Sequence, residues 1–187
     1  SPSSLTLTKG TAMTTNTPTV SGGAIVSWSI SPTLPTGLAF DTSTGAISGT
    51  PTVLSVSAAY TVTATNTGGS DTAAVTIVVN DELPVIVYSP SSLTLTKGTA
   101  MTTVTPTTSG GTIVSWSISP TLPTGLAFDT STGAISGTPT VLSVSAAYTV
   151  TATNTGGSDT AAVTIVVNDA VPVIAYSPSS LTLTKGT

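Results

Sequence analysis

The segment YTVTATNTGGSDTAAVTIVV, residues 148–167, decides the fold. In its first half, Tyr148, Val150 and Ala152 fall on one side of an extended chain and threonines fall on the other. This period of two is typical of a strand with one buried face. Glycines in NTGGS then allow a tight reversal before a second alternating run. The segment therefore predicts a β-hairpin. The inward residues expected in its second half are Ala161, Val163, Ile165 and Val167.

This hairpin occurs twice, because the chain repeats itself. Residues 1–88 align with residues 89–176 without a gap, and only six positions differ. A repeat of 88 residues is longer than a solenoid unit, which has about 20–50 residues, and long enough for a small domain. The chain is therefore expected to be a tandem array of domains. The paired differences are Asn16/Val104, Val20/Thr108, Ala24/Thr112, Glu82/Ala170, Leu83/Val171 and Val87/Ala175.

Each copy has further strand-like runs separated by turns. SLTLTKG and TIVSWSIS are rich in residues that suit a pleated sheet, while DTSTG, LPTG and GTPT predict reversals. No stretch shows the apolar stripe of an amphipathic helix. About seven short strands fit into each copy, which predicts an all-β protein of antiparallel β-sandwiches. Trp116 is expected in the core of its unit.

Two longer motifs carry a family resemblance. LPTGLAFDTSTGAISGTPT and AAYTVTATNTGGSDTAAVTIVV are present in both copies. They resemble the LPxGLxFD, TGxIxGTP and YxVTxTNxxG elements of the bacterial immunoglobulin-like repeat family, which is related to the dystroglycan-type cadherin-like domains. The resemblance implies tandem Ig-like antiparallel β-sandwiches of large secreted or surface proteins, and it implies no catalysis.

The resemblance also predicts the domain boundaries. Members of the family begin with a proline-led strand like PVIVYSPSSLTLTKG and end with a strand like VTIVVND. Residues 82–169 are then a complete Ig-like repeat, residues 1–81 are a repeat that lacks its first strand, and residues 170–187 are the first-strand segment of a third repeat. We therefore expect the chain to be a segment of a longer repetitive protein.

The first-strand segment leaves two arrangements open. Residues 172–176, PVIAY, can belong to a plain array, or they can complete the first repeat of another chain by strand addition. Residues 177–187 favour the plain array, because they duplicate residues that the other chain already has. PVIVY, residues 84–88, is apolar on both faces and is expected to be covered, either by its own and neighbouring units or by lateral packing of another chain.

The connection between the units is short. Only Asp81, Glu82 and Leu83 precede Pro84, which fixes its own φ and favours an extended Leu83. We expect a rod in which strands of about seven residues, roughly 25 Å long, set the length of each unit.

Composition excludes several classes of function. The chain has no cysteine and no histidine, which removes disulfides, thiolate metal sites and imidazole catalysis. Its three lysines and net charge of −4 provide no basic patch for nucleic acid, and no apolar run is long enough to cross a membrane. Charged residues are only 5% of the chain, which favours contact with neighbouring chains.

Calcium is the one metal with candidate ligands. Asn80, Asp81, Asn168 and Asp169 lie where repeats join and have the oxygen ligands that calcium prefers. They are too few for a complete site, and the DxD motif of cadherins is absent. Turn residues exposed to solvent are therefore the simpler interpretation, and no cofactor is expected.

Other chemistry has simpler explanations. An isopeptide bond between Lys9 and Asn80, or between Lys97 and Asn168, would need a mid-strand glutamate, which is absent. Asp41 and Asp129 are single in their units and predict Asx turns rather than a glycosidase pair. The threonine row on residues 149–153 suits an outward strand face rather than an ice-binding plane, because sandwich sheets twist. Serine and threonine hydroxyls could carry O-linked sugar.

These observations favour a structural repeat module of a long extracellular bacterial surface protein. The module would form a filament, a stalk or an adhesin shaft, including a fibre with lateral or head-to-tail strand contacts between identical chains. The alternative is a carbohydrate- or receptor-binding Ig-like adhesion module. An enzyme is not expected, and the expected partners are neighbouring repeats and identical chains rather than nucleic acid.

Overall fold

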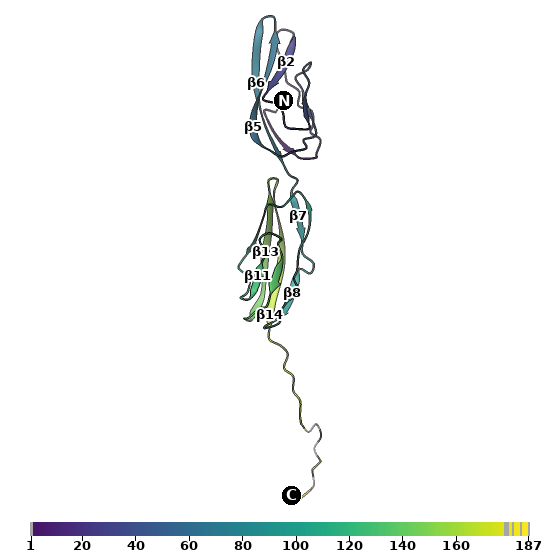
Figure 1. The fold of residues 1–187 in the computed structure, drawn as a ribbon, viewed down its shortest axis with the longest axis vertical. Coiled ribbons are helices and arrows are strands. Elements are labelled where there is room, and N and C mark those ends of the chain that lie inside the picture. Colours follow the sequence, from purple (N-terminus) through teal and green to yellow (C-terminus); the bar gives the residue numbers. More distant parts are fainter. Residues whose placement is uncertain (1, 178–179, 181, 184, 187) are drawn as a thin grey trace.

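The chain forms two β-sandwich units that lie end to end, followed by an extended tail (Figure 1). A computed structural model describes residues 2–177, 180, 182–183 and 185–186. All regular elements in these residues are strands, so the predicted all-β class is confirmed. Across the same residues, no helix has the length and apolar character needed to span a bilayer.

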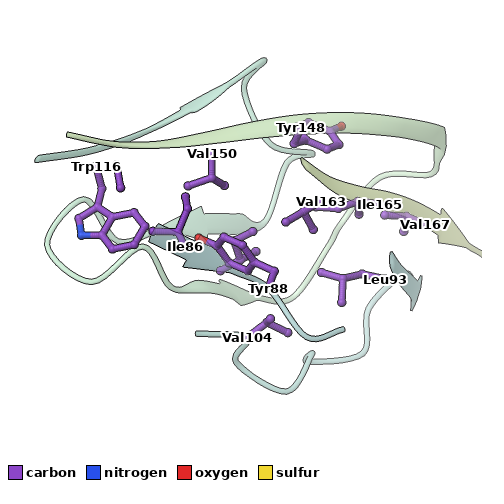
Figure 2. Packing of buried hydrophobic residues seen from close by; sticks show 12 residues of the cluster. Ile86, Tyr88, Leu93, Val104, Trp116, Tyr148, Val150, Val163, Ile165 and Val167 are labelled. Atoms are coloured by element: carbon purple, nitrogen blue, oxygen red, sulfur yellow. The ribbon is translucent and has the colours of Figure 1, made fainter. Parts of the chain in front are cut away.

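The second unit contains a four-stranded sheet of order β10-β13-β14-β8 and two two-stranded sheets, β7-β9 and β11-β12. Its core lies between the large sheet and the two small ones (Figure 2). The strands are β7 (Pro84–Val87), β8 (Ser92–Thr96), β9 (Thr107–Gly110), β10 (Ser115–Ser119), β11 (Leu126–Phe128), β12 (Ile135–Gly137), β13 (Ser143–Asn154) and β14 (Gly157–Asn168).

The hairpin of β13 and β14 supplies the centre of this core, as its alternation predicts. Tyr148 pairs with Val163 and Val150 pairs with Ala161 across the antiparallel ladder. Every second side chain therefore points inward, and each fully buried valine or isoleucine stabilises the fold by about 1.5–3 kcal/mol. Trp116 on β10 is also buried, as predicted. The buried residues of the hairpin are Tyr148, Val150, Ala152, Val163, Ile165 and Val167, with Ala161 partly buried beside them.

The opening strand differs from the expectation. It divides into β7, which pairs with β9, and β8, which pairs with β14. Pro90 lies between them and has no N–H group with which to continue a ladder. The pairing of β8 with β14 is parallel, so the expected purely antiparallel arrangement is wrong at this edge.

The two faces of β7 also differ from the expectation that both are covered. Pro84 and Ile86 are buried, whereas Val85 and Val87 are 47% and 53% exposed. β7 pairs only with β9, and this two-stranded sheet has one face toward the core and the other toward solvent. Cover of both faces by the chain's own units is therefore wrong, whereas lateral packing of another chain on the outer face stays a prediction. The main strands are also longer than predicted: β13 and β14 have 12 residues each, which corresponds to about 40 Å.

The first unit repeats this plan without one of the two small sheets. Its large sheet has the order β1-β6-β5-β2, and β3 pairs with β4. β1 pairs in parallel with β6, as β8 does with β14. Among the described residues it has no counterpart of β7 or β9. Its strands are β1 (Ser4–Thr8), β2 (Ser27–Ser31), β3 (Leu38–Phe40), β4 (Ile47–Gly49), β5 (Ser55–Asn66) and β6 (Gly69–Asn80).

The tail carries the third copy of the repeat sequence. Residues 170–176 form no strand and extend away from the second unit (Figure 1). Val173, Ile174 and Tyr176 are each more than 80% exposed. Part of the expected third first-strand segment, at residues 178–179, 181, 184 and 187, lies outside the described residues.

Because Tyr88 is buried, the second unit is expected to lose stability at high pH. Its ring is buried and its hydroxyl donates a hydrogen bond to the carbonyl oxygen of Gly133. Burial raises the pKa of Tyr88 from 10.0 to about 12. The folded state therefore favours the neutral phenol, and the resulting stability is complete below pH 10 and is lost as the pH rises toward about 12.

Urea unfolding at a series of pH values tests this expectation. The free energy of unfolding of the second unit should fall by about 3 kcal/mol across that window, since two pKa units correspond to roughly that energy. Tyr88→Phe should be less stable at neutral pH, because the Gly133 carbonyl loses its donor, and it should lose most of this pH dependence. An unchanged pH profile in Tyr88→Phe would contradict the assignment.

Candidate functional site: the junction between the units

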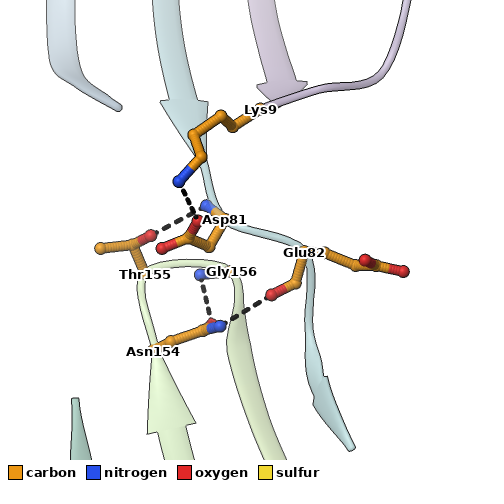
Figure 3. A network of polar contacts seen from close by, with 6 residues as sticks. All are labelled: Lys9, Asp81, Glu82, Asn154, Thr155 and Gly156. Atoms are coloured by element: carbon orange, nitrogen blue, oxygen red, sulfur yellow. Dashed lines mark hydrogen bonds and ion pairs between the residues drawn. The ribbon is translucent and has the colours of Figure 1, made fainter. Parts of the chain in front are cut away.

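The turn between β13 and β14 contacts the linker that leaves the first unit (Figure 3). The side-chain amide of Asn154 donates to the carbonyl oxygen of Glu82 over 2.7 Å. The backbone N–H of Asp81 donates to the hydroxyl of Thr155 over 2.9 Å. Asn154 is itself held in place, because its Oδ1 accepts from the N–H of Gly156 over 2.8 Å. The turn and the linker are thus joined by two direct hydrogen bonds.

An ion pair ties the first unit to the same linker. Lys9, directly after β1, places its Nζ 3.0 Å from Oδ1 of Asp81. Asp81 is only 7% exposed, so its charge requires this partner. The backbone N–H of Lys9 also donates to the carbonyl oxygen of Asn80 over 2.8 Å. The start of the linker is therefore fixed to the end of β1.

Two glycines allow the backbones to approach closely. A Cβ atom on Gly156 would lie 2.2 Å from the carbonyl oxygen of Asp81, and one on Gly111 would lie 2.3 Å from that of Glu82. A side chain on Gly156 would separate the turn from the linker, and one on Gly111 would separate the linker from the loop that follows β9. The junction is therefore packed backbone against backbone.

The same sequence gives no such contacts where no adjoining unit is described. Asn66, the counterpart of Asn154, keeps the local bond from the Gly68 N–H at 2.8 Å but is only partly buried. Asp169, the counterpart of Asp81, is exposed, and no ion pair joins it to Lys97 among the described residues. The contacts arise from the meeting of two units.

The four candidate calcium ligands differ in how far they are buried. Asp81 is buried and paired with Lys9, and Asn80 is partly buried beside it. Asn168 and Asp169 are exposed at the end of β14. No group of three or more acidic residues gathers within the described ranges. Calcium binding at these four residues stays a prediction.

The other residues considered from sequence have local roles. Asp129 accepts hydrogen bonds from the hydroxyl and the N–H of Ser131, and these bonds lower the pKa of its carboxyl to about 2. Ser43 lowers the pKa of Asp41 to about 2 in the same way. Both carboxylates therefore belong to Asx turns. The Lys9 ammonium is bonded to Asp81. Asp159 reaches back and accepts the N–H of Ile86 over 2.8 Å.

The junction residues of the NTGGS turn were missed by sequence reasoning, which assigned them only a reversal. Asn154 and Thr155 have identical counterparts in Asn66 and Thr67, so the sequence contains no signal that separates the two turns. The two turns differ because, among the described residues, a neighbouring unit contacts only the second of them.

Comparison with known proteins places this geometry in a family. A family model described as "Putative Ig domain" matches residues 1–80 and again residues 84–168. The "Serine-rich adhesin for platelets" of Staphylococcus aureus strain MRSA252 is 33% identical over 139 residues, which cover 68% of this chain and 9% of the adhesin. The homologous adhesin of strain MSSA476 is also 33% identical and is covered over 6% of its length.

The fold also resembles a solved structure. Extracellular domains 3–5 of Drosophila OTK superpose with a TM-score of 0.51 at 18% identity, covering 88% of this chain and 59% of that one. At this identity the likeness concerns the fold alone. With both units matched by one family model, the chain belongs to the Putative Ig domain family and carries two tandem copies of that domain.

Proposed function

We propose that this chain is a structural repeat module of a long extracellular bacterial surface protein, in which it forms part of a filament, stalk or adhesin shaft. The observation that carries the proposal is the junction, where the turn at residues 154–156 binds the three-residue linker. A shaft must hold successive units in one orientation, and two hydrogen bonds with close backbone packing restrict the swing between them.

The relatives support an extracellular location for such a module. The staphylococcal relative is named an adhesin for platelets, and this chain spans only 9% of its length. A repeat that occupies a small part of a large adhesin suits the shaft rather than the part that binds a target. We likewise propose residues 82–169 as the complete repeat, with residues 1–81 and 170–187 as incomplete ones.

A pair of matched variants tests whether the junction restricts the units. Asn154→Asp keeps the oxygen that accepts from Gly156 but replaces the amide donor to Glu82 with a second oxygen. The lost bond and the unpaired carbonyl correspond to about 1–3 kcal/mol. Asn66→Asp makes the same change in the first unit, where no neighbouring linker is contacted.

The measurement is the distribution of distances between fluorophores on two engineered cysteines, one in each unit, which is practical because the chain has no cysteine of its own. The unmodified chain and Asn66→Asp should each give one narrow distribution. Asn154→Asp should give a broader one. A broad distribution in the unmodified chain, or equal distributions in both variants, would contradict the shaft.

A further inference from the structure

β10 is the edge strand of the large sheet in the second unit, and β13 is its only neighbour in that sheet. The register between them is continuous from Ser115↔Thr153 to Ser119↔Thr149. The opposite side of β10 meets no other strand among the described residues. A regular, unpaired edge of this kind is a template for a further strand. The first unit has the same edge at β2, which pairs with β5 in the corresponding register.

The free hydrogen-bonding groups of this edge belong to Trp116 and Ile118. The carbonyl oxygen of Thr153 accepts the N–H of Val114 over 2.8 Å, so the backbone of Thr153 is directed toward β10. In an antiparallel pair, residues that exchange bonds alternate with residues that do not. Ser115, opposite Thr153, therefore bonds to β13. The N–H and C=O groups of Trp116 and Ile118 then point away from β13, and they have no backbone partner within the described ranges.

This edge lacks the charges that usually keep exposed edges apart. Proteins often protect an edge strand with lysine or with another charged side chain. At β8, on the opposite edge of the same sheet, Lys97 follows the strand directly. β10 instead presents only serine hydroxyls on its outward face, and these serines are exposed. The backbone of β10 is therefore open to a partner strand. The outward residues are Ser115, Ser117 and Ser119.

The distribution of charge favours a second copy of this chain as that partner. The net charge is −4, so copies of the chain repel each other unless they meet on an uncharged surface. Neither β10 nor β13 contains a charged residue, and the same is true of β2 and β5. A partner of strong charge would find no complementary group here. The charged residues of the second unit lie on β14 or outside the strands, at Lys97, Asp129, Asp159 and Asp169.

The strand also matches a second copy of itself in register. When Ser117 of both copies lies on a two-fold axis, Trp116 of each copy lies opposite Ile118 of the other. These are the residues with free backbone groups, so each Trp116–Ile118 pair can exchange two backbone hydrogen bonds. Pro120 has no N–H and ends the pairing. The sequence of β10 is thus self-complementary in the antiparallel direction.

An exposed valine gains a contact in the same arrangement. Val114, directly before β10, is 74% exposed, and its counterpart Val26 in the first unit is exposed to the same extent. Only Val114 has another unit before it in the structure, so the adjoining unit does not cover this position. About the two-fold axis, Val114 lies opposite Pro120 of the second copy. Apolar surface is therefore removed from water at both ends of the pairing.

We propose that β10 of one copy pairs antiparallel with β10 of a second copy, so that their large sheets become one continuous sheet. β2 has the same sequence and can take the place of β10 on either side. β13, the neighbour of β10, runs along the long axis of the chain (Figure 1), so paired copies lie side by side in opposite directions. Each contact is small, and successive units strengthen it by avidity.

This inference rests on the proposed shaft for its setting, because it turns single shafts into lateral bundles. Its geometry is independent of the junction, since β10 and β2 contribute none of the contacts that hold the linker. Failure of the pairing would therefore leave the shaft in place, and a flexible junction would leave the pairing in place.

Disulfide cross-linking tests the register, because the chain has no cysteine of its own. Ser29→Cys/Ser117→Cys places a thiol at the centre of each edge strand. In the proposed pairing, the two central residues lie opposite each other with Cα atoms about 4.5 Å apart, which is within the range of a disulfide. Both serines are exposed on the outer face, so the variant keeps the fold.

The matched control is Ser31→Cys/Ser119→Cys, on the same strands and the same exposed face. Ser119 lies opposite Ser115 of the other copy, so the new thiols are separated by four residues, or about 13 Å along the strand. This distance is too long for a disulfide, which needs Cα atoms within about 7 Å. A mixture of the control with Ser27→Cys/Ser115→Cys places thiols opposite each other again.

The measurement is the rate of disulfide-linked dimer formation under oxidising conditions at about 1 mM chain, the range of weak specific affinities. The central variant should form dimers at least about ten times faster than the control, because only its thiols lie within bonding distance. The mixture should form mixed dimers as fast as the central variant. Equal rates in the central variant and the control, no dimer in either, or no gain in the mixture would each overturn the pairing.

Discussion

Ile86→Asp is expected to lower the free energy of unfolding of the second unit by about 3–5 kcal/mol, whereas Val85→Asp should change it by less than about 0.5 kcal/mol. The two residues are neighbours on β7, but Ile86 is 4% exposed and Val85 is 47% exposed. A carboxylate at Ile86 would be buried without a partner. Because detaching β7 would return that charge to solvent, the loss is limited to the stability that β7 contributes through its packing and its pairing with β9.

The tryptophans allow this result to be assigned to one unit. Each unit has a single tryptophan, so a Trp28→Phe background leaves Trp116 as the reporter of the second unit. In Ile86→Asp, Trp116 should be partly exposed before unfolding, as Trp28 already is in the first unit, and its emission should shift to longer wavelength. A normal emission maximum together with unchanged stability would show that β7 contributes little to the core.

Gly137→Ala is expected to have a comparably large effect, lowering the stability of the second unit by about 3 kcal/mol or more. Gly137 ends β12 with φ of 121°, and a Cβ atom there would lie 2.3 Å from the carbonyl oxygen of Gly125. That oxygen belongs to the backbone directly before β11 and accepts the N–H of Thr138 over 2.9 Å, so it cannot move without breaking this bond. The substitution therefore adds a clash to an unfavourable backbone conformation.

Gly98→Ala tests the cost of the backbone conformation without the cost of the clash. Gly98 also has a positive φ, of 77°, but a Cβ atom there would meet nothing within 4 Å. Gly98→Ala should therefore cost only the conformational part, about 1 kcal/mol. Urea midpoints of the two variants measure the difference. Equal midpoints would mean that the hairpin adapts to the extra methyl group.

The core was predictable from sequence because it rests on local alternation. Tyr148, Val150 and Val163 occupy the inward positions that their period of two requires. The division of the opening strand has a signal in the sequence, because Pro90 cannot continue a ladder, but the two different sheets that its halves join depend on long-range pairing. The exposed outer face of β7 was not predictable, because valines at residues 85 and 87 suit a covered strand equally well.

The junction was only partly predictable. The short linker indicated that the relative orientation of the two units is restricted. The residues that bind the linker, however, come from a turn 72 or more residues away along the chain. Sequence reasoning favoured solvent-exposed turn residues at the junction, whereas Asp81 is buried and paired with Lys9 of the same chain. Pairing over such distances depends on the folded arrangement rather than on spacing.

The parallel edge pairs determine how the chain responds to being pulled. A load on the two ends of the second unit meets β7 first and then acts between β8 and β14, and in the first unit it acts between β1 and β6. Because these partners run in the same direction, as the register Ser92↔Thr164 to Thr96↔Asn168 shows, opposite forces on them act along the strands. The ladder bonds are then sheared together instead of opening one at a time, so each unit resists tension with its whole terminal pair.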